Sequence, residues 1–164
     1  EGVANLSLPV DSASLEELVA LYGQRIRIGV HGAAKAPATL ATQGADFILP
    51  DFVTPDIATI AEALALACYA TAMTPTEVAT ALTMPVTGVQ LRPAEVVGPI
   101  MAEHLQHMGL IDKTIPRGGL IPFTAKQWLS AGAPAVCVGR HLIGDALKGG
   151  DLAALRDRCR NLRN

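Results

Sequence analysis

The chain has 164 residues, of which 50% are hydrophobic and 17% charged, enough for one buried core but too few for two ordinary domains. Its 13 lysines and arginines against 15 aspartates and glutamates give a formal charge of −2, so no general attraction to nucleic acid is expected. The three cysteines form no Cys-x-x-Cys pair, which argues against a disulfide framework and favours a reducing, cytoplasmic location.

Short apolar or β-branched runs alternate with longer segments rich in alanine and leucine along the whole chain, which predicts repeated strand–helix units. Several runs are apolar on both faces, as parallel strands covered by helices are. We expect strands at residues 3–8, 25–30, 46–50, 67–72, 88–92, 113–116 and 135–139.

Helix starts are marked by side chains that can accept a hydrogen bond from the first-turn N–H groups. Thr54 precedes a proline, Thr124 and Gln127 have the spacing of a capping box, and Asp151 precedes the last expected helix at 152–162. We therefore expect helices to begin at these three places.

The pattern contains about seven strand–helix units, one fewer than the eight that close a barrel of this type. We expect an α/β fold, a parallel (β/α) TIM-type barrel that lacks its first β/α unit or has it truncated, and a single domain over residues 1–164. An open barrel leaves parallel edge strands unpaired, so another segment or chain is expected to cover the gap.

Five segments carry a more specific signal, and they lie at residues 44–50, 73–77, 89–99, 116–119 and 136–139. In order and spacing they resemble successive strand ends of the 2-keto-3-deoxy-6-phosphogluconate (KDPG) and 4-hydroxy-2-oxoglutarate (KHG) aldolases. The resemblance covers nearly the whole chain. It implies a class I aldolase, in which a lysine forms a Schiff base with a 2-oxo acid and a glutamate transfers protons.

The residues that carry this chemistry are changed. Where the family has Val-Lys-Leu-Phe-Pro-Ala, the chain has Val-Gln-Leu-Arg-Pro-Ala, so Gln90 stands in place of the lysine. Asn5 aligns with the family's glutamate, and Val30, His31, Ala70 and Thr71 are expected to line the pocket. An amide cannot form an imine, so the resemblance implies that the covalent step is lost, and we expect no cofactor.

No other lysine stands at the end of an expected strand, where the residues of a barrel site lie. The remaining lysines fall at a strand start or on helices and loops, and they are Lys35, Lys113, Lys126 and Lys148. Replacement of the missing amine by one of them is therefore not expected.

Glycine-rich turns follow the last two expected strands, where such barrels commonly hold a phosphate with backbone N–H groups. The candidate anion-binding residues are Gly118, Gly119, Gly139, Arg140 and His141, together with Arg92 and Arg117 at strand ends. A guanidinium can bind a carboxylate or phosphate through two hydrogen bonds. The alternative is that these arginines pair with Glu95, Asp112 or Asp145.

These observations favour a protein that keeps the aldolase scaffold to bind a small anionic metabolite, either a 2-oxo acid or a phosphorylated one, or to serve as an assembly subunit. An active lyase on a 2-keto-3-deoxy sugar acid or 4-hydroxy-2-oxo acid by an altered mechanism remains the alternative. The resemblance implies a homotrimer or a larger assembly. His104 and His107 lack a third ligand, so no metal is expected, and no apolar run is long enough for a membrane span.

Overall fold

The computed structural model describes residues 3–32 and 36–163. The chain forms two compact units. The N-terminal unit consists of Val3–Ala72 and Thr76–Gln90, and the C-terminal unit contains Met73–Pro75 and Leu91–Asn164. The expectation of a single domain stays a prediction.

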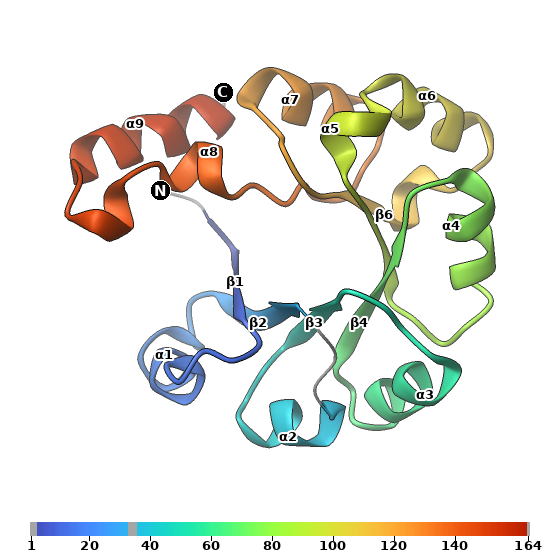
Figure 1. Cartoon of the computed structure of the whole chain (residues 1–164), viewed down its shortest axis with the longest axis horizontal. Helices are drawn as coiled ribbons and strands as arrows, with labels where there is room; N and C mark the ends of the chain where they lie inside the picture. The colour runs from blue at the N-terminus through green and yellow to red at the C-terminus, as the bar shows by residue number, and fades with distance from the viewer. Residues whose placement is uncertain (1–2, 33–35, 164) are drawn as a thin grey trace. The chain divides into compact units, whose positions relative to one another are not determined.

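The sheet confirms the expected fold class, because each strand neighbours the one that follows it in sequence, in the order β1-β2-β3-β4-β5-β6. The pairs from β1 to β4 are parallel. The strands are β1 Asn5–Pro9, β2 Arg27–Gly32, β3 Phe47–Pro50, β4 Ala67–Ala72, β5 Gly88–Leu91 and β6 Thr114–Pro116 (Figure 1).

Helices occupy most of the connections between these strands, as expected for β/α units. Those of the first half are α1 Leu15–Tyr22, α2 Pro37–Thr42, α3 Pro55–Ala63 and α4 Pro75–Ala81. Those of the second half are α5 Ala94–Val97, α6 Ile100–His107, α7 Pro122–Ser130, α8 Arg140–Ile143 and α9 Leu152–Arg163, with short 3-10 turns at Ile111–Lys113 and Ala146–Lys148. Among the described residues, no helix combines the length and the hydropathy that crossing a bilayer requires.

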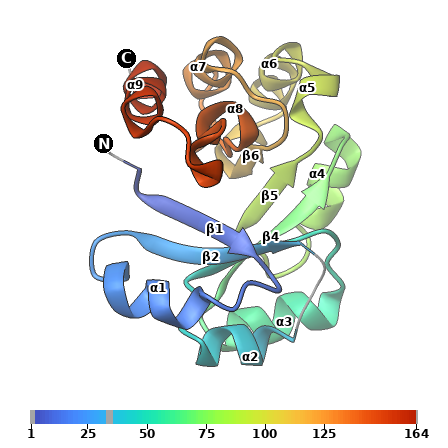
Figure 2. The ribbon, with the colours of Figure 1, turned by 60° about the vertical axis from the view of Figure 1, so that its left-hand side comes forward.

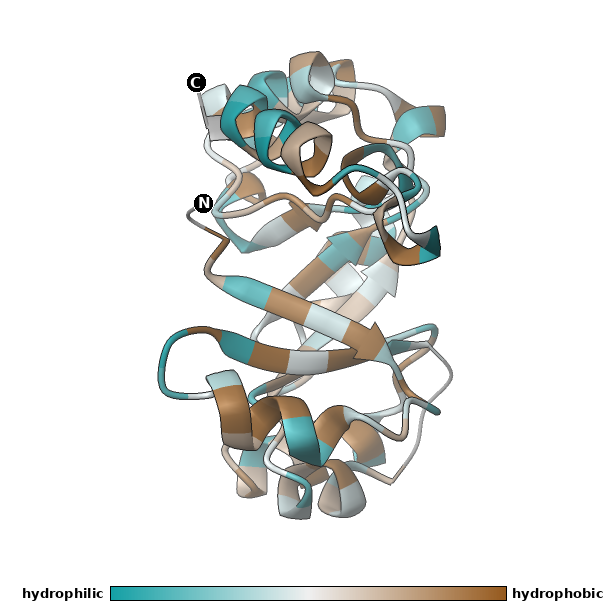
Figure 3. Cartoon of the chain, turned by 90° about the vertical axis from the view of Figure 1, so that its left-hand side faces the viewer, coloured by the Kyte–Doolittle hydropathy of each residue, from teal (hydrophilic) through white to brown (hydrophobic). Residues whose placement is uncertain are grey.

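The core of the N-terminal unit lies between one face of the strands and helices α1 to α3, which cover that face in Figure 2. Ile28, Val30, Ile48 and Cys68 face this core, where they join Leu15, Leu40, Ala61 and Leu66. Figure 3 shows the matching alternation of apolar and polar residues along β1 and β2. Because neighbouring strand residues point to opposite faces, His31 and Thr71 lie on the face away from this core.

Six of the seven expected strands are confirmed, with bounds that shift by one or two residues. The seventh, expected at 135–139, is reduced to one parallel bridge between Arg117 and Cys137. The reason is its neighbour: β6 has only three residues and ends at Pro116, which has no N–H to donate. The left-handed backbone of Gly118 and Gly119 then turns the chain away.

Two of the expected helix starts are confirmed. The Ile57 N–H donates to Thr54 Oγ1 over 3.3 Å, and the Ala153 N–H donates to Asp151 Oδ1 over 2.7 Å. The capping box at Thr124 is wrong, because α7 already begins at Pro122, whose fixed φ suits the first helical position. Thr124 lies in the first turn, and its Oγ1 accepts from the Ile121 N–H over 3.2 Å.

Candidate functional site

Gln90, on β5, is fully buried, with 0% of its surface exposed. Its Nε2 donates to the backbone carbonyl of Pro50 over 2.6 Å and to that of Tyr69 over 3.3 Å. These carbonyls belong to β3 and β4, so the amide nitrogen links three strands of the N-terminal unit. The amide nitrogen of Gln90 is therefore engaged by two main-chain acceptors.

Thr71 joins the same cluster near the end of β4. Its Oγ1 donates to the Pro50 carbonyl over 2.8 Å, so this oxygen accepts from both Thr71 and Gln90. A carbonyl oxygen has two lone pairs, and both donors can be accommodated. The polar cluster lies at the carboxyl ends of β3 and β4, the edge where barrel enzymes carry their sites.

A second polar contact joins the middle of β1 to the end of β2. Ser7 Oγ and His31 Nδ1 are 3.0 Å apart, and both residues are half-buried. Sequence reasoning singled out His31 but missed Ser7. A signal was present, since Ser7 alternates with Leu6 and Leu8 and so faces away from the apolar core with His31.

Val30 and Ala70 lie elsewhere than expected. Val30 belongs to the apolar core beneath the helices. Ala70 is 2% exposed, and by strand alternation it lies on the same face as Cys68, another core residue. Both residues therefore lie on the opposite face of their strands from His31 and Thr71, so these four do not form one pocket wall.

Asn5 is the first residue of β1 and is exposed. The register pairs Asn5 with Arg27, at the start of β2, and pairs Pro9 with His31 near the end of that strand. Asn5 thus lies toward the amino-terminal end of the sheet. The polar contacts of Ser7 and His31 lie nearer the carboxyl ends of the same strands.

In the C-terminal unit, the two glycine-rich turns follow neighbouring positions. Arg117 pairs with Cys137, and the Cys137 N–H donates to the Pro116 carbonyl over 2.9 Å. Gly118 and Gly119 follow one member of this bridge, and Gly139 follows the other by two residues. Within the described part of the chain, the N–H groups of Gly119 and Gly139 donate to no backbone acceptor, whereas the Gly118 N–H belongs to the parallel bridge between Arg117 and Cys137.

Arg140 and His141 are exposed and begin the short helix α8. Arg92 and Arg117 each interact with another residue.

The segment that contains Glu95 is joined to the first glycine turn by two backbone hydrogen bonds. The Ala94 N–H donates to the Arg117 carbonyl over 2.9 Å, and the Glu95 N–H donates to the Gly118 carbonyl over 3.1 Å. The side chain of Glu95 then lies directly against Gly119. A methyl group at Gly119 would overlap both the carboxylate and the Cβ of Glu95, so no larger residue fits there.

The remaining candidates take no part in these clusters. His104 and His107 are exposed on α6, and the described residues contain no group of three potential metal ligands. Lys113, Lys126 and Lys148 are exposed, and Lys35 lies outside the described residues.

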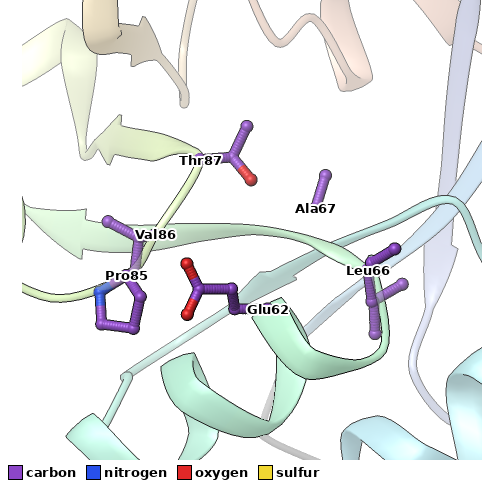
Figure 4. A pocket seen from close by; sticks show the side chains of 7 residues that line it. Glu62, Leu66, Ala67, Pro85, Val86 and Thr87 are labelled. Atoms are coloured by element: carbon purple, nitrogen blue, oxygen red, sulfur yellow. The ribbon is translucent and has the colours of Figure 1, made fainter.

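A hollow of about 360 Å³ lies at the opposite end of the strands, where α3 meets the start of β4 and the segment before β5 (Figure 4). Its lining is apolar except for Glu62 and Thr87. The Thr87 hydroxyl oxygen is already used, since it accepts from the Cys68 N–H over 3.0 Å. A single carboxylate with no converging partner does not make this hollow a reaction centre.

Cys68 and Cys137 are expected to react slowly with alkylating reagents at neutral pH. Burial raises the pKa of Cys68 to about 11 and also raises that of Cys137, against a smaller lowering by Arg117. The protonated thiol is the unreactive form. Peptide mapping after iodoacetamide treatment should show Cys68 unmodified near pH 8. Above about pH 9 the Cys68 thiol ionises in the unfolded chain but not in the folded one, so the free energy of unfolding should fall. Rapid labelling of Cys68 in the folded protein would contradict this assignment.

One family model and several solved structures match the chain. A family model described as KDPG and KHG aldolase matches residues 26–157. No curated protein matches the chain.

Three of the similar solved structures illustrate the likeness. A native KDPGal structure shares 22% identity, with a TM-score of 0.83 over 98% of this chain and 80% of that one. The KDPG aldolase of Legionella pneumophila, with pyruvate captured as a covalent carbinolamine, shares 16% identity, with a TM-score of 0.76 over 98% and 82%. The Zymomonas mobilis aldolase with 3-phosphoglycerate shares 16% identity, with a TM-score of 0.72 over 97% and 77%. These likenesses show the TIM-type fold.

Proposed function

The chain belongs to the KDPG and KHG aldolase family, and from this premise we propose that it binds a small anionic 2-oxo acid without forming a Schiff base. One observation carries the proposal. Gln90, in the position of the nucleophilic lysine, is buried, and its nitrogen donates to Pro50 and Tyr69. An amide nitrogen has no basic lone pair, so it cannot attack a carbonyl carbon.

Anion binding is supported separately by the C-terminal unit. The N–H groups of Gly119 and Gly139 have no backbone acceptor within the described residues, and free backbone donors of this kind can bind an anion. Arg140 and His141 are exposed immediately after Gly139 and add positive or polar groups. The relatives crystallised with pyruvate and with 3-phosphoglycerate suggest the ligand chemistry to test first.

The alternative is an active lyase that works without a covalent intermediate. It is favoured by the contact between Ser7 and His31 and by the hydroxyl of Thr71, which lie toward strand ends on the face away from the apolar core. Such polar groups can stabilise a developing negative charge on a carbonyl oxygen. The homotrimer or larger assembly and the cytoplasmic location expected from the sequence stay predictions.

The covalent step is tested by incubating the protein with pyruvate and borohydride and measuring its mass. We expect no stable adduct, because reduction traps an imine only where an amine has formed one. A lysine-bearing aldolase of the family, treated in parallel, is the positive control. An adduct on this chain, located by peptide mapping at Lys113, Lys126 or another lysine, would overturn the proposal.

Binding itself is tested by thermal unfolding with pyruvate. A ligand that binds only the folded state must raise the midpoint of unfolding. Cleavage of a 4-hydroxy-2-oxo acid without an adduct would favour the lyase alternative.

A further inference from the structure

The hollow beside the end of α3 is a second candidate binding site, separate from the polar clusters at the carboxyl ends of the strands. All its lining residues belong to the N-terminal unit. Its volume of about 360 Å³ falls in the range of small-molecule sites, roughly 300 to 1,000 Å³. Five of its seven lining residues are apolar, namely Ala65, Leu66, Ala67, Pro85 and Val86. The walls therefore suit an aliphatic ligand.

One charged side chain lies against this apolar lining. Figure 4 shows the Glu62 carboxylate extending from α3 toward the segment that carries Val86 and Thr87. Within the described part of the chain, that carboxylate makes no hydrogen bond and no ion pair. Its charge is therefore available to a ligand that enters the hollow.

The end of α3 adds to this negative character. The C-terminal end of a helix carries partial negative charge, and cations in the last turn offset it. Helix α3 has no basic residue in its last turn, where Glu62 has the same sign as the helix end. The carbonyls of Ala63 and Leu64 accept no hydrogen bond from the described residues. A cation bound in the hollow would offset both sources of negative charge.

A basic side chain also lies near this edge of the sheet. Arg27 donates to the Asp46 carbonyl over 3.4 Å, and the same oxygen accepts from the N–H of Ala67, a lining residue, over 3.3 Å. The carboxylate of Asp46 accepts from the Ile28 N–H over 2.7 Å. Arg27 and Asp46 are thus neighbours of opposite charge and together add no net charge, so the charge of Glu62 is not cancelled by them.

A protonated primary amine on a short aliphatic chain matches these groups. The ammonium carries the charge that offsets Glu62, and the methylene groups of the chain fit the apolar walls. The Thr87 hydroxyl oxygen has two lone pairs, of which the Cys68 N–H uses one, so this oxygen can also accept from the ammonium. An anion would be repelled by Glu62, and an uncharged hydrocarbon would leave Glu62 without a partner.

We propose that this hollow binds a small aliphatic amine in its protonated form, with Glu62 as the residue that selects the charge. The site is independent of the proposed 2-oxo acid function, because it shares no residue with the polar clusters or the glycine turns. Either proposal can therefore fail without the other.

The test titrates n-butylamine, which is protonated at about pH 7 like a lysine side chain, into the ¹⁵N-labelled chain at low ionic strength. The backbone amide signals are followed by NMR. We expect saturable shifts at Leu66, Ala67 and Val86, which line the hollow. Glu62→Gln should weaken binding at least about fivefold, since two opposite unit charges about 4 Å apart contribute roughly that factor in water and more in less polar surroundings.

Glu17→Gln is the matched control, because it removes the same charge from an exposed position on α1 in the same unit, and it should bind n-butylamine like wild type. n-Butanol has the same aliphatic chain without the charge. It should bind wild type at least about fivefold more weakly than the amine does, and Glu62→Gln should not weaken it further.

Equal affinity for n-butylamine in wild type and Glu62→Gln would overturn the proposal, as would an equal loss in Glu17→Gln. Shifts that do not saturate, or that saturate only at residues away from the hollow, would show that the amine binds acidic side chains of the surface at random. That result would also overturn the proposal.

Discussion

Replacing Gln90 with leucine is expected to lower the free energy of unfolding by about 2 to 3 kcal/mol. The two side chains have similar volumes, so the loss comes mainly from the hydrogen bonds to the Pro50 and Tyr69 carbonyls. Leucine offers these oxygens no donor, and a buried carbonyl that loses its partner costs more than an exposed one. Urea unfolding, with the midpoint and slope fitted together, measures the difference.

The matched control is Gln106→Leu, which makes the same chemical change at an exposed position on α6 and should alter stability by less than about 0.5 kcal/mol. Thr71→Val tests the shared acceptor, since Thr71 and Gln90 both donate to the Pro50 carbonyl. Removing both donors should cost more than the sum of the single changes, because only then is the Pro50 oxygen left without these donors. Wild-type stability in Gln90→Leu would show that the amide does not link the strands.

The positions of the strands could be predicted from the sequence because each strand is marked by its own run of apolar residues. Parallel strands covered by helices are continuous apolar runs, and six of them stand where the runs predicted. The starts of α3 and α9 were also local, since Thr54 and Asp151 accept hydrogen bonds from N–H groups two or three residues away. The seventh strand failed because its extent depends on a partner, and β6 ends at Pro116.

The residues that line the pocket were harder to predict, because residues one position apart on a strand point to opposite faces of the sheet. An alignment that slips by one residue moves a side chain from one face to the other. Val30 and Ala70 were expected beside His31 and Thr71. Val30 instead packs in the apolar core, and Ala70 lies on the same face of β4 as the core residue Cys68. The contact of Ser7 with His31 joins residues 24 positions apart and could only be read through strand register.

The surroundings of Gln90 could not be predicted at all. The resemblance predicts an amide where the family has its lysine, but the acceptors of Gln90 lie 40 and 21 residues away, on other strands. Glu95 presents the same difficulty. The pair Gly118–Gly119 indicates an anion site by composition, while the approach of Glu95 to Gly119 depends on how the segment after β5 meets the turn after β6.

The variant Gln90→Lys, which places a lysine where the resemblance predicts one, is expected to leave most of the protein unreactive toward pyruvate at about pH 7. An ammonium in this position would face the Pro50 and Tyr69 carbonyls, which accepted from the amide. Their hydrogen bonds favour the charged form and raise the lysine pKa, whereas burial lowers it. With two acceptors directed at one nitrogen, we expect the charged form to prevail, so the fraction of neutral amine grows only as the pH rises.

The measurement is the mass of the borohydride-reduced adduct at about pH 7 and about pH 10, with wild type treated identically to subtract any reaction at exposed lysines. We expect less than about one tenth of Gln90→Lys to be modified at the lower pH and several times more at the higher. Complete modification near pH 7 would show that the carbonyls do not hold the nitrogen.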